Sequence, residues 1–487
     1  MDLKEFIKTA SLTQLNNGLK NKDFSSVELT SAYLERAKSL NNQTNAFITI
    51  DEEYALNSAK KADELIKNGK AKPLTGIPLA IKDNICTKNL KTTCASKMLE
   101  DFEPFYDATA VSRLKKQGAV ILGKTNMDEF AMGGSSSTSY FGAVKNPYDL
   151  TRVPGGSSGG SAVAVATGTS AAALGSDTGG SVRQPASFTG ITGLKPTYGT
   201  VSRFGLIAFA SSFDQIGTMA KSAEDCGILL NAIAGGDEFD STCRTAPFKN
   251  CLKNIEKGVK NLKIGLPKEF FGDDINGEVK AAVFKAAETF KNMGAEIVEV
   301  SLPDLKYAVA AYYLISSAEA ASNLSRYDGI KYGHRSEKGK TYEEIIKNSR
   351  REGFGKEVKR RIMLGNYALS SGYYDAYYTK AVKIRQKLKA DLDEIFKSCD
   401  LILTPTAPTT AYKIGSNEKN PVKMYTADIC TVLANIAGLP ALSTTCGYDK
   451  KGLPIGMSLM GKPLSESTII RAATAFEMQF ERREATL

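Results

Sequence analysis

The sequence predicts a single large α/β domain with additional helices. Apolar runs with the pattern of buried strands alternate with amphipathic helices, as in the strand, helix and strand expected over residues 262–303. No low-complexity linker and no fixed-period repeat divides the 487 residues into separate units. An apolar share of 42% and a charged share of 24% are typical of an ordered globular protein, so we expect one continuous fold.

The first elements are predicted to be helical. Ser25 and Glu28 form the sequence pattern of a capping box, and apolar residues follow at helical spacing over residues 25–40. We expect residues 1–60 to form an N-terminal helical region that packs on the core, and residues 61–487 to form the main domain.

Strands and helices then alternate along the chain. Residues 74–84 predict a short buried strand that ends near Lys82. Asp107 is expected to cap a helix that closes at Gly118, with a strand directly after it. Small-residue runs and glycine turns over residues 161–215 predict a buried helix, a strand and a glycine loop.

The C-terminal part continues the α/β pattern. A long helix is expected around residues 371–397, and a buried strand over residues 399–408. A last helix stops at Gly438 and is followed by one more strand.

Composition argues against membrane, zinc-binding and disulfide-rich classes. The N-terminus lacks a basic and then apolar leader, and no apolar run approaches the roughly 18 to 20 residues of a membrane span, so we expect a soluble, cytoplasmic chain. The eight cysteines are scattered without zinc-type spacing and are expected to be small buried hydrophobic residues. The net charge of +10 is spread along the chain, which permits a nucleic-acid neighbour without indicating a dedicated binding surface.

Residues 118–125 match the phosphate-loop pattern GxxxxGK[ST], with Lys124 at the lysine position. A phosphate loop follows a strand and wraps its amide groups around phosphates, whereas residues 119–122 form an apolar run that itself predicts a strand. We therefore expect a buried strand and a turn here, and no nucleotide site.

The glycine- and serine-rich segment 155–161 has the composition either of a linker or of a catalytic loop. It contains GxSxG twice, centred on Ser157 and Ser158, which is typical of the nucleophile elbow of α/β-hydrolases. That elbow requires an apolar strand before it and a histidine base after it, but the preceding residues are polar and interrupted by proline. The single histidine, His334, stands in a polar segment that predicts a solvated loop, which disfavours it as a catalytic base.

A serine nucleophile without a histidine needs another proton acceptor, and a desolvated lysine can serve. Lys82 ends an apolar run, where a low dielectric would favour its neutral form, although a surface side chain at a strand end is the alternative. A second glycine loop contains Thr178, Gly179, Gly180 and Ser181, whose backbone N–H groups could stabilise an oxyanion. A turn that caps the following helix is the alternative for this loop.

Three motifs follow Lys82 in a specific order: GGSSGGSA at 155–162, DTGGSVRQPAS at 177–187 and GLKPTYGTVS at 193–202. In these motifs and their spacing the chain resembles the amidase signature family. The resemblance implies a single amidase signature domain over residues 61–487, in which helices cover both faces of a mixed central sheet.

The resemblance also implies catalytic roles. Ser181 would be the acylated nucleophile, Ser157 the bridging serine after a cis peptide bond, and Lys82 the base. The oxyanion hole would be formed by backbone N–H groups of Thr178, Gly179, Gly180 and Ser181.

Within that family, the chain resembles the A subunits of glutamine-dependent amidotransferases that act on glutamyl-tRNA(Gln) or aspartyl-tRNA(Asn). The similarity is carried by residues 319–333, 359–378 and 424–443. It implies glutamine as the substrate, with Arg361 at its carboxylate, Asp428 at its ammonium group and Tyr312 as a further contact. A surface ion pair, an acid at a helix N-terminus and core packing are the respective alternatives for these three residues.

The same resemblance implies partners. B and C subunits would complete a heterotrimer, in which the B subunit binds most of the tRNA. ATP and Mg²⁺ are expected at the partner, which would use ammonia to amidate Glu-tRNA(Gln) or Asp-tRNA(Asn), and no cofactor is expected in this chain. The alternative is a stand-alone amidase that hydrolyses another small amide. Ser137 replaces an acid that is common in these subunits, which affects the expected transfer of ammonia but not its formation.

Overall fold

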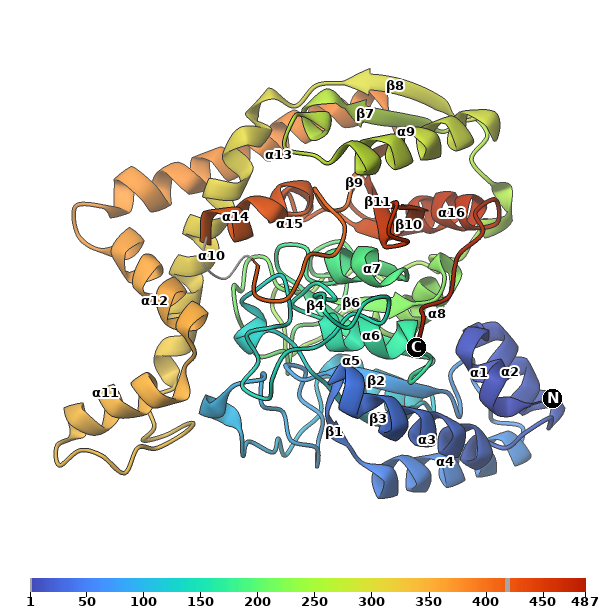
Figure 1. The fold of residues 1–487 in the computed structure, drawn as a ribbon, viewed down its shortest axis with the longest axis horizontal. Helices are drawn as coiled ribbons and strands as arrows, with labels where there is room; N and C mark the ends of the chain where they lie inside the picture. Colours follow the sequence, from blue (N-terminus) through green and yellow to red (C-terminus); the bar gives the residue numbers. More distant parts are fainter. Residues whose placement is uncertain (1, 417–420) are drawn as a thin grey trace.

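An eleven-stranded mixed β-sheet runs through the computed structural model, which describes residues 2–416 and 421–487 (Figure 1). The strands lie in the order β1-β3-β2-β4-β6-β5-β10-β11-β9-β7-β8. Their bounds are β1 Phe47–Ile50, β2 Pro78–Lys82, β3 Val120–Thr125, β4 Ala172–Asp177, β5 Thr192–Lys195, β6 Gln215–Ala220, β7 Lys263–Pro267, β8 Glu296–Val300, β9 Leu401–Pro405, β10 Ala441–Tyr448 and β11 Pro454–Gly461. This sheet confirms the predicted α/β class.

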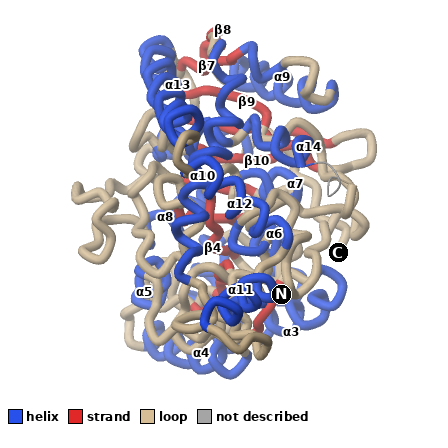
Figure 2. Tube along the Cα trace, turned by 90° about the vertical axis from the view of Figure 1, so that its left-hand side faces the viewer, coloured by secondary structure: helices blue, strands red, loops and turns tan. Residues whose placement is uncertain are grey.

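Helices cover both faces of the sheet, as the resemblance implied. Their bounds are α1 Leu3–Thr9, α2 Leu12–Asn21, α3 Ser26–Thr44, α4 Glu52–Lys67, α5 Thr109–Lys116, α6 Gly159–Ala166, α7 Arg183–Thr189, α8 Ala223–Ile233, α9 Gly277–Asn292, α10 Ala308–Asn323, α11 Tyr342–Gly353, α12 Lys356–Leu369, α13 Lys380–Ser398, α14 Pro421–Thr426, α15 Val432–Ile436 and α16 Glu466–Glu477. Two consecutive residues of β6 contact different helices. Gly217 lies against Val182, which directly precedes α7, and the Thr218 hydroxyl donates to the Cys226 carbonyl of α8. Because side chains alternate along a strand, α7 and α8 pack on opposite faces (Figure 2).

The N-terminal region begins with helices, and one of them has the predicted capping box. Ser25 Oγ accepts from the Glu28 N–H group at the start of α3, and the Glu28 carboxylate accepts from the Ser25 N–H group. The region also supplies a strand, since β1 pairs antiparallel with β3 at one edge of the main sheet. The division after residue 60, which falls inside α4, stays a prediction.

The carboxyl ends of the parallel strands β2 and β4 lie next to each other in the sheet. β2 pairs in parallel with both β3 and β4, and Ile81 lies opposite Leu174. Lys82 and Ser176 therefore lie close together on adjacent strands, near the carboxyl end of each. The segment 155–161 leads into α6, which packs on β4, so this segment reaches the same edge.

Asp107 does not cap α5, so that prediction was wrong. No side chain caps the start of the helix. The Asp107 carboxylate instead accepts from the Lys88 N–H group at 2.8 Å and pairs with Lys115 Nζ at 2.7 Å. The Asp107 carboxylate therefore binds the Lys88 N–H group and the Lys115 amine, and not the N–H groups in the first turn of α5.

The long helix expected around residues 371–397 begins later than predicted. A π-helical turn, Asp375–Thr379, precedes α13. The predicted strand at the end of this helix is confirmed as β9.

All eight cysteines are buried and free, which confirms their prediction as small hydrophobic residues. Among the helices in the described part of the chain, none has the length and apolarity needed to cross a bilayer.

Candidate active site

Lys82, at the end of β2, is fully buried and has three oxygen atoms within hydrogen-bond distance. Its Nζ lies 2.7 Å from Ser157 Oγ, 2.9 Å from Ser176 Oγ and 3.3 Å from the Ser176 carbonyl oxygen. Asn84 Nδ2 donates to Ser176 Oγ at 2.9 Å and holds that hydroxyl beside the lysine. All three oxygens are uncharged, so the amine contacts groups that can exchange a proton with it or solvate it.

Burial lowers the pKa of Lys82 to about 7, although the nearby carboxylates of Asp128 and Asp177 favour the charged form. A large share of Lys82 is therefore neutral at neutral pH. A neutral amine has one lone pair, and Ser157 Oγ, the nearest of the three oxygens, belongs to a hydroxyl that can donate its proton to that lone pair. The pair has the geometry for proton transfer from Ser157 to Lys82.

The segment 155–161 is buried and is not a linker, since residues 155–158 form a loop and residues 159–161 begin α6. The Gly156-Ser157 peptide bond is cis, as predicted. The Gly156 N–H group donates to Gln184 Oε1 at 2.9 Å, and the Asp128 N–H group donates to the Ser157 carbonyl at 3.2 Å. These contacts hold the backbone on both sides of the cis bond, which fixes the Ser157 hydroxyl against the lysine.

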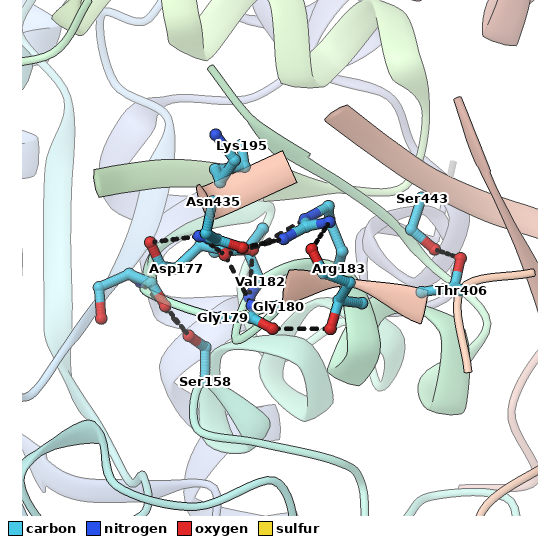
Figure 3. A network of polar contacts seen from close by, with 12 residues as sticks. Ser158, Asp177, Gly179, Gly180, Val182, Arg183, Lys195, Thr406, Asn435 and Ser443 are labelled. Carbon is cyan, nitrogen blue, oxygen red and sulfur yellow. Dashed lines mark hydrogen bonds and ion pairs between the residues drawn. The ribbon is translucent and has the colours of Figure 1, made fainter. Parts of the chain in front are cut away.

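The second glycine loop, residues 177–181, is fixed by a buried ion pair (Figure 3). Asp177 accepts from Nε and Nη2 of Arg183, both at 3.1 Å, and neither side chain reaches solvent. Asn435 donates to Asp177 Oδ1 at 2.8 Å and accepts from Arg183 at 2.7 Å. Burial alone would raise the pKa of Asp177, but the Arg183 guanidinium holds it well below its usual range. The loop is therefore anchored to a permanently ionised carboxylate.

The backbone N–H groups of this loop fall into two sets. The Gly180 N–H group donates to Asp177 Oδ1 at 2.8 Å, so it is engaged within the loop. The N–H groups of Thr178, Gly179 and Ser181 have no acceptor among the residues that the structure describes. Three of the four N–H groups expected to form an oxyanion hole are free to bind a ligand oxygen, and the fourth is not.

One pocket brings most of the predicted site residues together. It is lined by Gly179, Gly180, Ser181, Tyr312, Arg361 and Asp428, with Ala131, Gly133 and Gly156 completing its wall. Ser181 is mostly buried, with 8% of the residue exposed, and it lines this pocket. Two of the three residues with free amides, Gly179 and Ser181, thus share one pocket with the charged residues Arg361 and Asp428, whereas Thr178 does not line it.

The two charged residues of the pocket are held through one tyrosine. Arg361 of α12 is buried, and its Nε donates to Glu357 Oε1 at 2.8 Å. Its guanidinium lies over the ring of Tyr313, 4.7 Å from the centroid, and the Tyr313 hydroxyl donates to Asp428 Oδ2 at 2.6 Å. Burial raises the pKa of Asp428 to about 6, so the carboxylate is still mostly ionised at neutral pH.

Tyr312 of α10 has both a packing role and a place in the pocket. It is 3% exposed, and its ring contacts those of Phe213 and Tyr313. Its hydroxyl lies so close to Gly179 that a Cβ atom at that position would be 2.4 Å from the Tyr312 oxygen.

Two residues with possible catalytic patterns lie elsewhere. Lys124 is buried within β3, where its Nζ donates to the Ile85 carbonyl at 2.9 Å and to Thr92 Oγ1 at 2.7 Å. The segment is a strand and a turn, as predicted, and not a phosphate loop. His334 lines a separate cleft and lies 3.1 Å from the Glu352 carboxylate.

Ser137 is partly buried outside the pocket. Its Oγ lies 2.7 Å from Ser135 Oγ, and the N–H groups of Ser135 and Ser136 donate to Asp128 Oδ2 at 3.1 and 2.8 Å. Asp128 therefore holds this loop beside the cis peptide bond. Within residues 2–416 and 421–487, no group of three or more His, Cys, Asp and Glu side chains is placed to hold a metal ion.

Sequence reasoning missed the residues that position these groups. Ser176 and Asp177 immediately precede Thr178, and their place beside the glycine loop was an available signal. Thr431 contacts Gly179 and Asn435 contacts Asp177, which are 252 and 258 positions away in the sequence, and no local sequence pattern predicts such contacts.

Comparisons with known proteins agree with this geometry. The family model described as Amidase matches residues 28–470. The A subunit of glutamyl-tRNA(Gln) amidotransferase from Ruminiclostridium cellulolyticum is 57% identical over 95% of both chains, and that from Caldanaerobacter subterraneus is 55% identical over 96% of both.

Solved structures give the same result. The crystal structure of the A subunit of glutamyl-tRNA(Gln) amidotransferase from Thermotoga maritima is 40% identical, with a TM-score of 0.82 over 99% of both chains. The peptide amidase from Stenotrophomonas maltophilia is 30% identical, with a TM-score of 0.82 over 98% of both chains. The chain therefore belongs to the amidase family, among the A subunits of glutamyl-tRNA(Gln) amidotransferases.

Proposed function

We propose that the chain hydrolyses glutamine and supplies the ammonia to a partner subunit that amidates Glu-tRNA(Gln), or Asp-tRNA(Asn). The observation that carries the chemistry is the 2.7 Å contact between Lys82 Nζ and Ser157 Oγ, next to a pocket that contains Ser181. The relatives' name supplies the tRNA substrate.

In the first half-reaction, neutral Lys82 accepts the proton of Ser157, which in turn accepts the proton of Ser181. Ser181 Oγ attacks the side-chain amide carbon of glutamine, and the amide oxygen becomes an oxyanion bound by the free N–H groups of the glycine loop. The carbon–nitrogen bond then breaks. The proton returns through Ser157 to the leaving nitrogen, which departs as ammonia, and a γ-glutamyl ester remains on Ser181.

In the second half-reaction, water attacks the ester carbon and gives one proton to Ser157, whose own proton passes to Lys82. The ester carbon–oxygen bond breaks, Ser181 recovers its proton, and glutamate leaves. The sum is glutamine and water converted into glutamate and ammonia, with every protein group restored.

The substrate's two charged groups fit the two charged side chains of the pocket. A guanidinium suits a carboxylate, so Arg361 would bind the α-carboxylate. Asp428 would bind the α-ammonium group, and Tyr312 would line the space between these groups and the glycine loop. Tyr313 contacts both Arg361 and Asp428, and would keep them at a fixed separation.

An exposed aromatic surface on α12 and the turn before α13 supports a protein partner. We define this tyrosine surface as Met363, Tyr367, Leu369, Tyr373, Tyr374 and Tyr377, which are between 37% and 66% exposed. Large apolar surfaces rimmed by polar groups mark interaction sites, and tyrosine is enriched in them. The surface shares α12 with Arg361, so a B or C subunit bound there would lie near the pocket. ATP, Mg²⁺ and most of the tRNA would be held by the partner, and the reaction would take place in the cytoplasm.

The test is ammonia release from amide-labelled glutamine, measured for the chain alone and co-purified with its partners, with and without ATP and Glu-tRNA(Gln). We expect release that depends on Ser181 and rises with partners, together with a γ-glutamyl adduct on Ser181 detectable by mass spectrometry. Ser181→Ala should abolish both signals. Ser137→Ala, which removes a serine outside the pocket, is the matched control. Hydrolysis of unrelated amides but not of glutamine, with no effect of partners, would instead identify a stand-alone amidase.

A further inference from the structure

We infer that the Thr431 hydroxyl is a positioning group that ties the segment recognising the substrate ammonium group to the loop that forms the oxyanion hole. This inference rests on the proposed hydrolysis of glutamine, and it explains how that site would favour an amide that carries an α-ammonium group.

Thr431 is bonded to two segments through its hydroxyl and its backbone. Its Oγ1 lies 2.6 Å from the Gly179 carbonyl oxygen and 3.1 Å from that of Asp428. A hydroxyl has one proton, and the shorter contact takes it. The Thr431 N–H group donates to the Asp428 carbonyl at 2.9 Å, so Thr431 bonds to both segments at once.

The bond to Gly179 determines which way the loop's amides face. In the peptide unit between Gly179 and Gly180, the carbonyl binds Thr431 and the N–H group binds Asp177. The two ends of the unit are thus fixed on opposite sides. The N–H groups of Gly179 and Ser181, which flank this unit, have no acceptor among the described residues and are left free for a ligand oxygen, as is that of Thr178.

The packing around Thr431 leaves it little freedom to move. Thr431 is 1% exposed, and a Cβ atom at Gly180 would lie 2.3 Å from its Oγ1. Arg183 Nη1 donates to the Thr431 carbonyl at 3.0 Å, which connects its backbone to the ion pair with Asp177. A small displacement of Thr431 must therefore be transmitted to the glycine loop.

Asp428 lies in the 3-10 turn Ala427–Cys430, directly before Thr431. A substrate ammonium group bound to its carboxylate would hold that turn, and through Thr431 the Gly179 carbonyl. An amide without the ammonium group would lack this contact. Misplacing catalytic groups by about 1 Å can lower the rate about 10²-fold. Binding of the ammonium group would therefore raise kcat, because through Thr431 it would hold the oxyanion-binding loop in place.

The experiment compares Thr431→Val, which keeps the shape and removes the hydroxyl, with Thr431→Ser, which keeps the hydroxyl. Both are assayed in the complex with partners on glutamine and on glutaric acid monoamide, which has the carboxylate and the amide but no ammonium group. For Thr431→Val we expect kcat on glutamine to fall about 10- to 100-fold with KM within about twofold. The glutamine preference over the monoamide should shrink about tenfold. Thr431→Ser should keep both values near those of the wild type.

Three results would overturn the inference. They are an unchanged kcat in Thr431→Val, an equal fall on both substrates, and a loss in Thr431→Ser as large as that in Thr431→Val. Calorimetric melting temperatures of both variants separate a loss of fold from a loss of positioning. A wild-type complex that releases no ammonia from glutamine would refute the proposed function itself, before any variant is made.

Discussion

Two fully buried lysines lie on neighbouring parallel strands, and they differ in the third group that contacts each amine. Lys82 ends β2, and Lys124 lies in β3 opposite Ile81. Each has hydrogen-bond contacts to a hydroxyl and a carbonyl oxygen. Lys124 also has the Asp83 carboxylate at 3.5 Å, whereas the third partner of Lys82 is the Ser157 hydroxyl.

The group that contacts a buried lysine determines whether its amine stays charged or can accept a proton. Burial lowers the pKa of both lysines, and for Lys124 the Asp83 carboxylate opposes the shift most strongly. A carboxylate neighbour stabilises the charge and gives a structural ion pair. A hydroxyl neighbour leaves the amine near neutrality and gives a proton acceptor. Burial alone therefore does not identify a catalytic lysine.

The largest effect is expected from changing Lys82. Lys82→Ala removes the base, and Lys82→Arg replaces it by a group that stays protonated, so both should lower kcat on glutamine by about 10⁴-fold. Steady-state ammonia release measures this, with circular dichroism to verify folding. A Lys82→Arg variant with more than a tenth of wild-type activity would disprove the role of a neutral lysine.

Lys124→Met should act on stability instead. Removing the amine leaves the Asp83 carboxylate buried without its cation, and breaking a buried pair costs about 3 to 5 kcal/mol. Urea unfolding measures the loss, and Lys124→Met combined with Asp83→Asn should recover part of it. Folded Lys124→Met protein should keep activity within about threefold. ATP binding that disappears in this variant would restore the phosphate-loop interpretation.

The pH dependence of kcat should follow Lys82. The amine must be neutral to accept a proton, and its pKa lies at about 7, so kcat should rise with pH through 7 and fall about tenfold per pH unit well below it. The acidic limb is measured with the complex in buffers of constant ionic strength. A flat profile from about pH 5.5 to 8 would contradict this assignment.

The smallest effect is expected from His334→Ala. His334 bonds to Glu352 in a separate cleft, so glutamine hydrolysis should stay within about twofold of the wild type. A tenfold loss would mean that the lysine does not act alone as the base.

Much of the fold follows from local sequence, because periodicity and capping are local properties. The capping box at Ser25 and Glu28 and the strand that contains Lys124 are examples. The Asp107 cap failed because Lys115 and the Lys88 N–H group compete for its carboxylate. Strand order depends on pairing between distant segments, and no local pattern specifies it.

The site divides in the same way. Lys82, Ser157 and Ser181 stand in motifs that can be read directly, and the resemblance added Arg361 and Asp428. The engagement of the Gly180 N–H group with Asp177 could not be predicted, since the composition of the loop is the same whichever way a peptide unit faces. The contribution of Thr431 depends on a contact across most of the fold.

That contact has a consequence for the order in which the chain is made. During synthesis from the N-terminus, Lys82, Ser157 and Ser181 are all present long before Thr431 and Asn435 are added. Until then, the Gly179 carbonyl lacks Thr431, and Arg183, although Asp177 is already present, lacks its contacts with Thr431 and Asn435. Contacts of such high sequence separation require the closure of a long loop of chain, which makes their formation slow. The three proposed catalytic residues are therefore present at an early stage of translation, whereas the proposed activity would require the nearly finished polypeptide.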